Sequence, residues 1–123
     1  KLLDKLNGTI FAIEGNHDKT ILGTKCRDRF VWIKQIHKLS VDGFPLYLSH
    51  YPLLTWPGRW KQGSANIHGH LHSANTHDDP RVRRFDVSME TNDYQPWNLD
   101  EVVAIMKSRP ILTPEDLGYE RPI

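Results

Sequence analysis

Apolar residues are grouped in short runs along the chain, and the spacing within each run predicts its secondary structure. Residues 9–13 form a continuous apolar run, which predicts a strand buried on both faces. Residues 30–41 are rich in strand formers and predict two short strands or one bent strand. Asp42 and Gly43 predict a hairpin turn, followed by a return strand over residues 44–49.

The second half of the chain adds two strands and a helix. Residues 65–68 and 84–88 predict short strands, with polar loop between them. Asn98 is a predicted helix N-cap, and apolar residues recur at helical spacing after it, ending near Ser108. This order of elements predicts an α/β fold with mixed β-sheets.

The beginning of the chain predicts the end of a helix. Residues 1–6 have helical spacing, Asn7 and Gly8 would end the helix, and no initiator methionine is present. We therefore expect the chain to begin inside a larger domain.

The length of the chain limits the number of domains. With 123 residues it fits one domain at most. We expect residues 1–123 to form a single, N-terminally truncated domain, with residues 109–123 as its tail.

Composition narrows the classes of function. The formal net charge is +1 without a run of like charges, which argues against a dedicated nucleic-acid or membrane surface. A single cysteine excludes an internal disulfide and fits a reducing compartment, so we expect a cytoplasmic protein. No apolar run is long enough to span a bilayer, and no signal peptide is present.

Three short motifs in the sequence contain histidine, and each motif follows a predicted strand. Residues 15–18 read Gly-Asn-His-Asp, His50 ends the return strand, and residues 69–72 read Gly-His-Leu-His. Imidazole nitrogens and an amide oxygen are suitable ligands for Zn, Fe or Mn. A protonated histidine can also donate a proton to a leaving group.

Each motif also has a simpler interpretation. Residues 15–18 contain common turn formers, and a turn is the favoured interpretation of that motif alone. A lone histidine such as His50 is more often structural than a ligand. Residues 69–72 could be a solvated cluster at the end of a strand. The argument for a site depends on the three motifs occurring together.

Taken together, the three motifs resemble the later motifs of the calcineurin-like metallophosphoesterase superfamily. Those motifs are Gly-Asn-His-Asp/Glu, a lone histidine after a strand, and Gly-His-x-His. The resemblance extends over residues 10–88. It implies a four-layer α/β/β/α sandwich, incomplete in this chain. The Asp form of the first motif resembles small bacterial or phage-type members more than the protein Ser/Thr phosphatases.

The resemblance also implies a set of ligands and a reaction. Asn16, His50 and His70 would bind one divalent metal, and His72 would bind a second. Mn is favoured for both, with Fe or Zn as alternatives. The intact enzyme would hydrolyse a phosphate mono- or diester by attack of a hydroxide that bridges the metals.

Catalysis would involve the histidine of the first motif. The resemblance implies that His17 contacts the phosphate and acts as general acid or transition-state stabiliser. Asp18 would orient or stabilise His17. No membrane partner is expected, and a nucleic acid would be expected only as a substrate.

The chain departs from the family pattern at its beginning. The Asp-x-His and Gly-Asp motifs that supply the carboxylate ligands do not occur before Asn16. Neutral ligands leave the charge of two dications uncompensated. The expected partner is therefore the missing N-terminal half of the domain or a complementing chain. The main alternative is an inactive metal-binding fragment, and a more distant one is a nucleic-acid-binding module.

Aromatic and basic residues near His50 suggest a possible rim for the site. Trp56 and Arg59 could stack on a substrate and bind its anionic group. The favoured alternative is a loop anchored by tryptophans that pack on the core. Residues 81–84 include three arginines, for which a solvated strand face is the default and anion binding is second.

Overall fold

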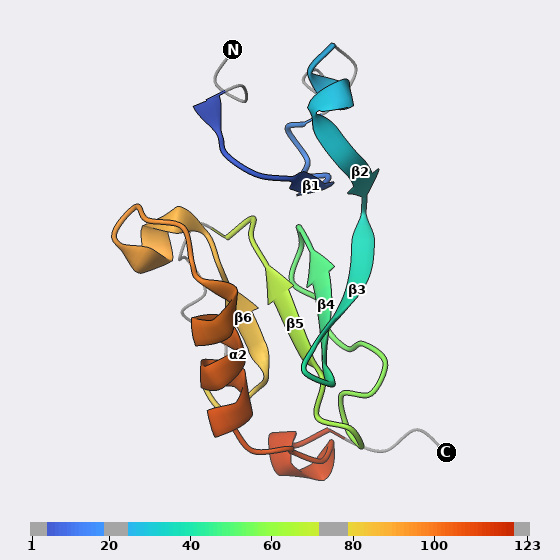
Figure 1. The fold of residues 1–123 in the computed structure, drawn as a ribbon. Helices are drawn as coiled ribbons and strands as arrows, with labels where there is room; N and C mark the ends of the chain where they lie inside the picture. Colours follow the sequence, from blue (N-terminus) through green and yellow to red (C-terminus); the bar gives the residue numbers. More distant parts are fainter. Residues whose placement is uncertain (1–4, 19–24, 72–78, 120–123) are drawn as a thin grey trace.

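The structure, a computed structural model, describes residues 5–18, 25–71 and 79–119 (Figure 1). Its described strands form two sheets, one of order β1-β2 and one of order β3-β4-β5-β6. The elements in chain order, with 3₁₀-helices marked η, are β1 (Ile10–Ile13), η2 (Lys25–Arg29), β2 (Phe30–Lys34), β3 (Ile36–Val41), β4 (Phe44–Ser49), β5 (Ala65–His68), β6 (Arg84–Asp86), η3 (Met89–Asn92), α2 (Leu99–Ser108) and η4 (Glu115–Leu117). The predicted mixed α/β class is confirmed, with one α-helix among the described residues.

The predicted hairpin joins β3 to β4. Asp42 and Gly43 both have positive φ, at 50° and 82°, as a two-residue hairpin turn of the mirror-image type requires. The two strands pair antiparallel, with Leu39 opposite Leu46. Residues 30–41 divide into two strands that belong to different sheets, so the prediction of two short strands is confirmed.

Two of the strands that precede histidine motifs, β4 and β5, end at the same edge of the larger sheet. β4 pairs parallel with β5, and β5 pairs parallel with β6. Parallel strands bring their carboxyl ends to the same edge, where residues that follow them can meet. Figure 1 shows these ends directed toward β1. The sheet topology therefore brings together the segments after β4 and β5, and the contacts of Asn16 add the turn after β1.

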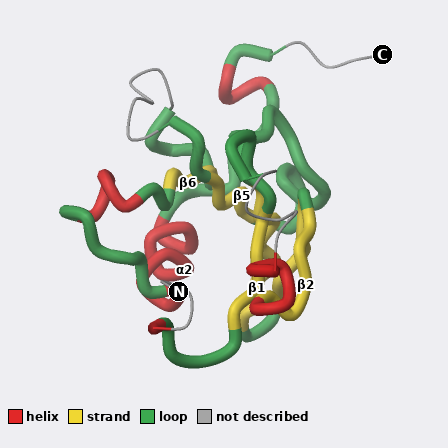
Figure 2. The backbone as a smooth tube through the Cα atoms, turned by 90° about the horizontal axis from the view of Figure 1, so that it is seen from above, coloured by secondary structure: helices red, strands yellow, loops and turns green. Residues whose placement is uncertain are grey.

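The hydrophobic core lies between the larger sheet and α2. Its buried residues come from these elements and comprise Phe44, Leu46, Ala65, Ile67, Val102, Val103 and Met106. Viewed from above, α2 lies to one side of the strands (Figure 2). Asn98 caps α2 by accepting a hydrogen bond from the backbone N–H of Asp100, at 2.9 Å, which confirms the predicted N-cap.

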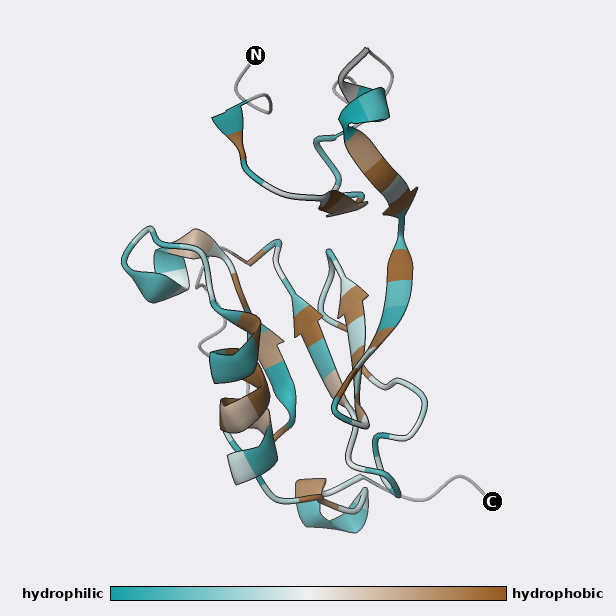
Figure 3. Cartoon of the chain, in the orientation of Figure 1, coloured by the Kyte–Doolittle hydropathy of each residue, from teal (hydrophilic) through white to brown (hydrophobic). Residues whose placement is uncertain are grey.

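Burial of β1 on both faces was predicted, and for Phe11 that prediction is wrong. Its side chain is 52% exposed. Among the described strands, β1 pairs with β2 alone, and Val31 on β2 is also exposed. Figure 3 shows these apolar strands beyond the end of the larger sheet. The described residues thus leave apolar surface on the small sheet uncovered.

The remaining differences are local. The strand predicted over residues 84–88 ends at Asp86, because the Asp86 carboxylate accepts hydrogen bonds from the N–H and hydroxyl of Ser88 and turns the chain. The predicted end of a helix over residues 1–6 lies largely outside the described residues. No helix in the described ranges has the length and apolar character needed to cross a bilayer.

Candidate functional site

Three side chains from separate parts of the chain converge at the edge described above. Asn16 lies in the turn after β1, His50 directly follows β4, and His70 lies two residues after β5. His50 Nε2 is 2.6 Å from Asn16 Oδ1 and 3.1 Å from His70 Nδ1. His70 Nδ1 is 3.3 Å from Asn16 Oδ1. We call these three atoms the donor triangle.

The donor triangle has the dimensions of one face of a metal coordination shell. Ligand bonds of about 2.1 Å place neighbouring octahedral ligands about 3 Å apart. The three separations, 2.6, 3.1 and 3.3 Å, lie close to that value. The tautomer of each imidazole decides which ring nitrogen donates a hydrogen bond in these contacts and which carries a lone pair. With both of these nitrogens unprotonated, all three atoms offer lone pairs, and a divalent cation could bind them together.

The backbone at His70 is in an uncommon conformation. Its φ is +70°, in the left-handed region that residues other than glycine rarely adopt. The turn is held by a hydrogen bond from Leu71 N–H to the Gly69 carbonyl, at 2.8 Å. Gly69 N–H also donates to the His50 carbonyl, at 3.0 Å, and so links two members of the triangle through their backbones. Such conformations are concentrated at functional sites.

Gly15 lies in tight contact with His50. A Cβ at Gly15 would lie 3.0 Å from His50 Nδ1 and 3.0 Å from Asp18 Oδ2. Asp18 accepts a hydrogen bond from Gly15 N–H at 2.7 Å, so its carboxylate closes the turn that carries Asn16. The close approach favours a glycine for steric reasons, since a Cβ would force these neighbours to move by a few tenths of an ångström. The backbone of Gly15 is not in the left-handed region, so its conformation does not require glycine.

We expect Gly15→Ala to lower the affinity of the chain for Mn²⁺ by about tenfold, because the added methyl group must displace the His50 ring or the Asp18 carboxylate. Gly69→Ala is the matched control, since its Cβ would meet its nearest neighbours at 3.8 Å or more. Calorimetric titration of both variants with MnCl₂ measures the difference. Equal affinities of the two variants would contradict this steric role of Gly15.

Tyr51 is a neighbour of the triangle that the sequence reasoning did not single out. Its ring lies 4.5 Å from the His70 ring and 5.1 Å from the His50 ring, between centroids. The side chain is 51% exposed. Beside it opens a cavity of about 320 Å³, whose lining includes Asn16, His50 and Ile36. The position of Tyr51 next to His50 in the sequence was the available clue.

The other proposed site residues have different placements. His17 is exposed and directly follows Asn16 in the turn. His72, the expected ligand of a second metal, lies outside the described residues. Within the described ranges, no cluster of three or more His, Cys, Asp or Glu side chains could hold a metal ion. The donor triangle is a different kind of group, because its third member is the amide of Asn16.

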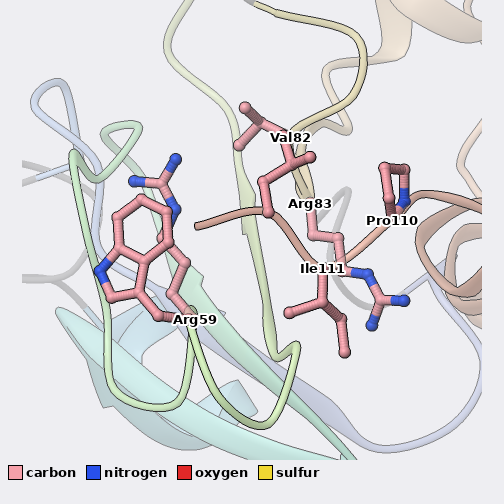
Figure 4. Close-up of a pocket in the computed structure, with 7 residues that line it drawn as sticks. Arg59, Val82, Arg83, Pro110 and Ile111 are labelled. Atoms are coloured by element: carbon pink, nitrogen blue, oxygen red, sulfur yellow. The ribbon is translucent and has the colours of Figure 1, made fainter. Parts of the chain in front are cut away.

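The loop after His50 packs on itself. Trp56 is 5% exposed and donates from Nε1 to the Ser64 carbonyl at 3.0 Å. Arg59 is 7% exposed, lies against the rings of Trp56 and Trp60, and donates to the Leu54 carbonyl. The pocket beside Arg59 has a volume of about 10 Å³, which is room for one water molecule (Figure 4). The structure therefore agrees with the interpretation of this loop as one anchored by a packed tryptophan, rather than as an open rim of the site.

Two of the three arginines in residues 81–84 bind backbone carbonyls. Arg83 donates to the carbonyls of Arg109 and Gly63, and Arg84 donates to that of Leu53. Burial lowers the pKa of Arg83. Arg81 is exposed, and its hydrogen bonds lower the pKa of Asp79 to about 2. The prediction of a solvated face thus holds for Arg81. Arg83 and Arg84 instead connect neighbouring loops to the sheet through hydrogen bonds to backbone carbonyls.

Comparison with known proteins reveals two relatives. No protein-family model matches the chain. An uncharacterized protein of Methanocaldococcus jannaschii is 34% identical over 127 residues, which cover 95% of this chain and 61% of that protein. A crystal structure of a protein of unknown function from Aquifex aeolicus superposes with a TM-score of 0.64 and 25% identity, covering 85% of this chain and 64% of the other. The chain thus shares its fold with the Aquifex protein and spans less than two thirds of each relative.

Proposed function

We propose that the chain carries the C-terminal part of a binuclear metallophosphoesterase site, within an incomplete four-layer α/β/β/α sandwich. The intact enzyme would hydrolyse a phosphate mono- or diester. The observation that carries the proposal is the donor triangle, in which Asn16, His50 and His70 meet within 3.3 Å of one another. These are the three residues that the resemblance to calcineurin-like metallophosphoesterases assigns to one metal.

The residues of the triangle suit a divalent transition metal. Two imidazoles and one amide oxygen form a mixed nitrogen and oxygen set, which accommodates Mn, Fe or Zn, with Mn favoured. In the proposal His72 belongs to a second ion. Bound metals would supply positive charge to the phosphoryl group and lower the pKa of coordinated water. The chain itself contributes the position and orientation of the ligands.

The charge of the ligand set supports a requirement for a partner. Asn16, His50 and His70 are neutral donors, so they do not offset the charge of two dications. The partner in this proposal is an N-terminal half of the domain or a complementing chain that brings carboxylates. The exposed apolar residues Phe11 and Val31 offer it a surface on the two-stranded sheet.

The proposed acid is His17. It is exposed and one residue from Asn16, so a phosphoryl group near the triangle is within reach of the same turn. A protonated His17 would donate to the leaving-group oxygen. Asp18 acts through the turn, because its carboxylate accepts from Gly15 N–H at 2.7 Å. The cavity of about 320 Å³ beside Asn16 provides space for the organic part of the ester.

The alternative is an inactive metal-binding fragment, which the neutral charge of the donor triangle favours. A nucleic-acid-binding module has less support, because the guanidinium of Arg59 is held between two indole rings. We therefore keep nucleic acid only as a possible substrate, and we propose a cytoplasmic location without a membrane partner.

The test supplies the full chain with MnCl₂ and measures bound metal and hydrolysis of bis(4-nitrophenyl) phosphate. We expect His17→Ala to retain metal and to lose at least about 100-fold in turnover, the contribution of a general acid. His37→Ala is the control, because this histidine lies in β3, packs against Trp32 of β2 and is not a member of the donor triangle. Bound metal without turnover would support the fragment. Absence of bound metal in the unmodified chain would overturn the proposal.

A further inference from the structure

One buried amide links the segments that carry two of the three donors. Asn66 lies in β5, and its side chain has no exposed surface. Its Nδ2 donates to the Tyr47 carbonyl at 2.9 Å and to Ser49 Oγ at 3.0 Å. Its Oδ1 accepts from Leu53 N–H at 2.9 Å. Both protons of the amide nitrogen and its oxygen are therefore engaged.

These bonds bracket His50 on both sides. Ser49 Oγ, which accepts from Asn66, also donates to the Tyr51 carbonyl at 2.7 Å. Residues 47, 49, 51 and 53 are thus fixed, directly or through Ser49, by the side chain of Asn66. His50 lies in the middle of this series. The strand that holds Asn66 continues into the turn of His70, so the bonds of Asn66 connect this strand to the segment around His50.

We propose that Asn66 is a positioning residue that sets the separation of His50 from His70 in the donor triangle. The inference rests on the proposed function, because it assigns the amide to the same metal site. Asparagine is suited to this position because it donates twice and accepts once. A leucine of similar size would remove the hydrogen-bond partner of the Tyr47 carbonyl, the Ser49 hydroxyl and the Leu53 N–H. An aspartate would place a carboxylate against the Tyr47 carbonyl.

The test compares Asn66→Ala with Ser64→Ala. Ser64 precedes β5, is equally buried and donates to the Pro57 carbonyl at 2.6 Å, away from the triangle. Both variants lose buried hydrogen bonds, so the thermal unfolding temperature should fall in both. We expect only Asn66→Ala to lose about 10- to 100-fold in affinity for Mn²⁺, as supporting residues of metal sites do. Affinity is measured by calorimetry, below the unfolding transition of each variant.

A second variant and a second readout keep the test decisive. Ser49→Ala removes the hydroxyl that accepts from Asn66 Nδ2 and donates to the Tyr51 carbonyl. The bonds of Asn66 to the Tyr47 carbonyl and the Leu53 N–H remain, so we expect a smaller loss of affinity from this variant. The imidazole NMR resonances of His50 and His70, recorded without metal, should shift in Asn66→Ala and not in Ser64→Ala. If the unmodified chain binds no Mn²⁺, the metal proposal fails while these resonances still test the positioning role. Equal effects of Asn66→Ala and Ser64→Ala on both readouts would overturn it.

Discussion

Replacement of His50 by alanine is expected to lower the affinity of the chain for Mn²⁺ by at least about 100-fold. His50 Nε2 lies 2.6 Å from Asn16 Oδ1 and 3.1 Å from His70 Nδ1, so this nitrogen joins the other two donors. Its removal leaves one imidazole and one amide, whose donor atoms are 3.3 Å apart. Titration with MnCl₂, followed by electron paramagnetic resonance of the free ion, measures the loss.

Two variants serve as references for this experiment. Asn16→Ala removes a weaker, neutral oxygen ligand, and we expect its loss of affinity to be smaller than that of His50→Ala. His37→Ala removes a half-buried imidazole outside the triangle and should bind as the unmodified chain does. Unchanged binding by His50→Ala would show that the three side chains converge for a reason other than a metal.

The parts of the fold that were predictable from the sequence are those that local chemistry decides. Asp42 and Gly43 can both adopt positive φ, so the hairpin of β3 and β4 follows from two adjacent residues. The side chain of Asn98 caps α2 within its own first turn. The family resemblance assigns Asn16, His50 and His70 to one site, and their side chains do lie together, whereas their role as ligands stays a prediction. Their convergence depends on parallel strands that end at one edge, which the element order only suggests.

The features that the sequence did not reveal depend on contacts between distant segments. Burial of Trp56 agrees with the favoured interpretation of its loop, but the partners of Trp56 and Arg59, the Ser64 and Leu54 carbonyls, were not predicted. Asn66 stands in a short, otherwise buried strand, where an asparagine needs partners for three hydrogen bonds. That was a usable clue, although its partners lie 13 to 19 residues away.

The misjudged burial of Phe11 has a related cause. A continuous apolar run indicates that both faces of a strand avoid water, and it does not say which segment covers them. In the described residues β2 covers one edge of β1, and Phe11 remains half exposed. The apolar run therefore indicates that another segment should cover this strand, and the described residues do not provide one. This is consistent with the partner segment that we propose for the site.

His70→Gly and His70→Ala are both expected to lose at least about 100-fold in affinity for Mn²⁺, and to differ in stability. The φ of +70° at this position is unfavourable for alanine and open to glycine. Without metal, we expect the free energy of unfolding of His70→Gly to exceed that of His70→Ala by about 1 kcal/mol. Urea denaturation in the presence of EDTA measures the difference.

Ala104→Gly provides the opposite case, because Ala104 is exposed in the right-handed backbone of α2. There glycine should lower the free energy of unfolding by about 1 kcal/mol. If His70→Ala and His70→Gly have the same free energy of unfolding, the left-handed turn is not maintained in solution. If His70→Gly is also more stable than the unmodified chain without metal, His70 costs the fold stability. The imidazole would then be retained for binding, because a residue that strains the backbone and lowers stability is kept where it serves a function.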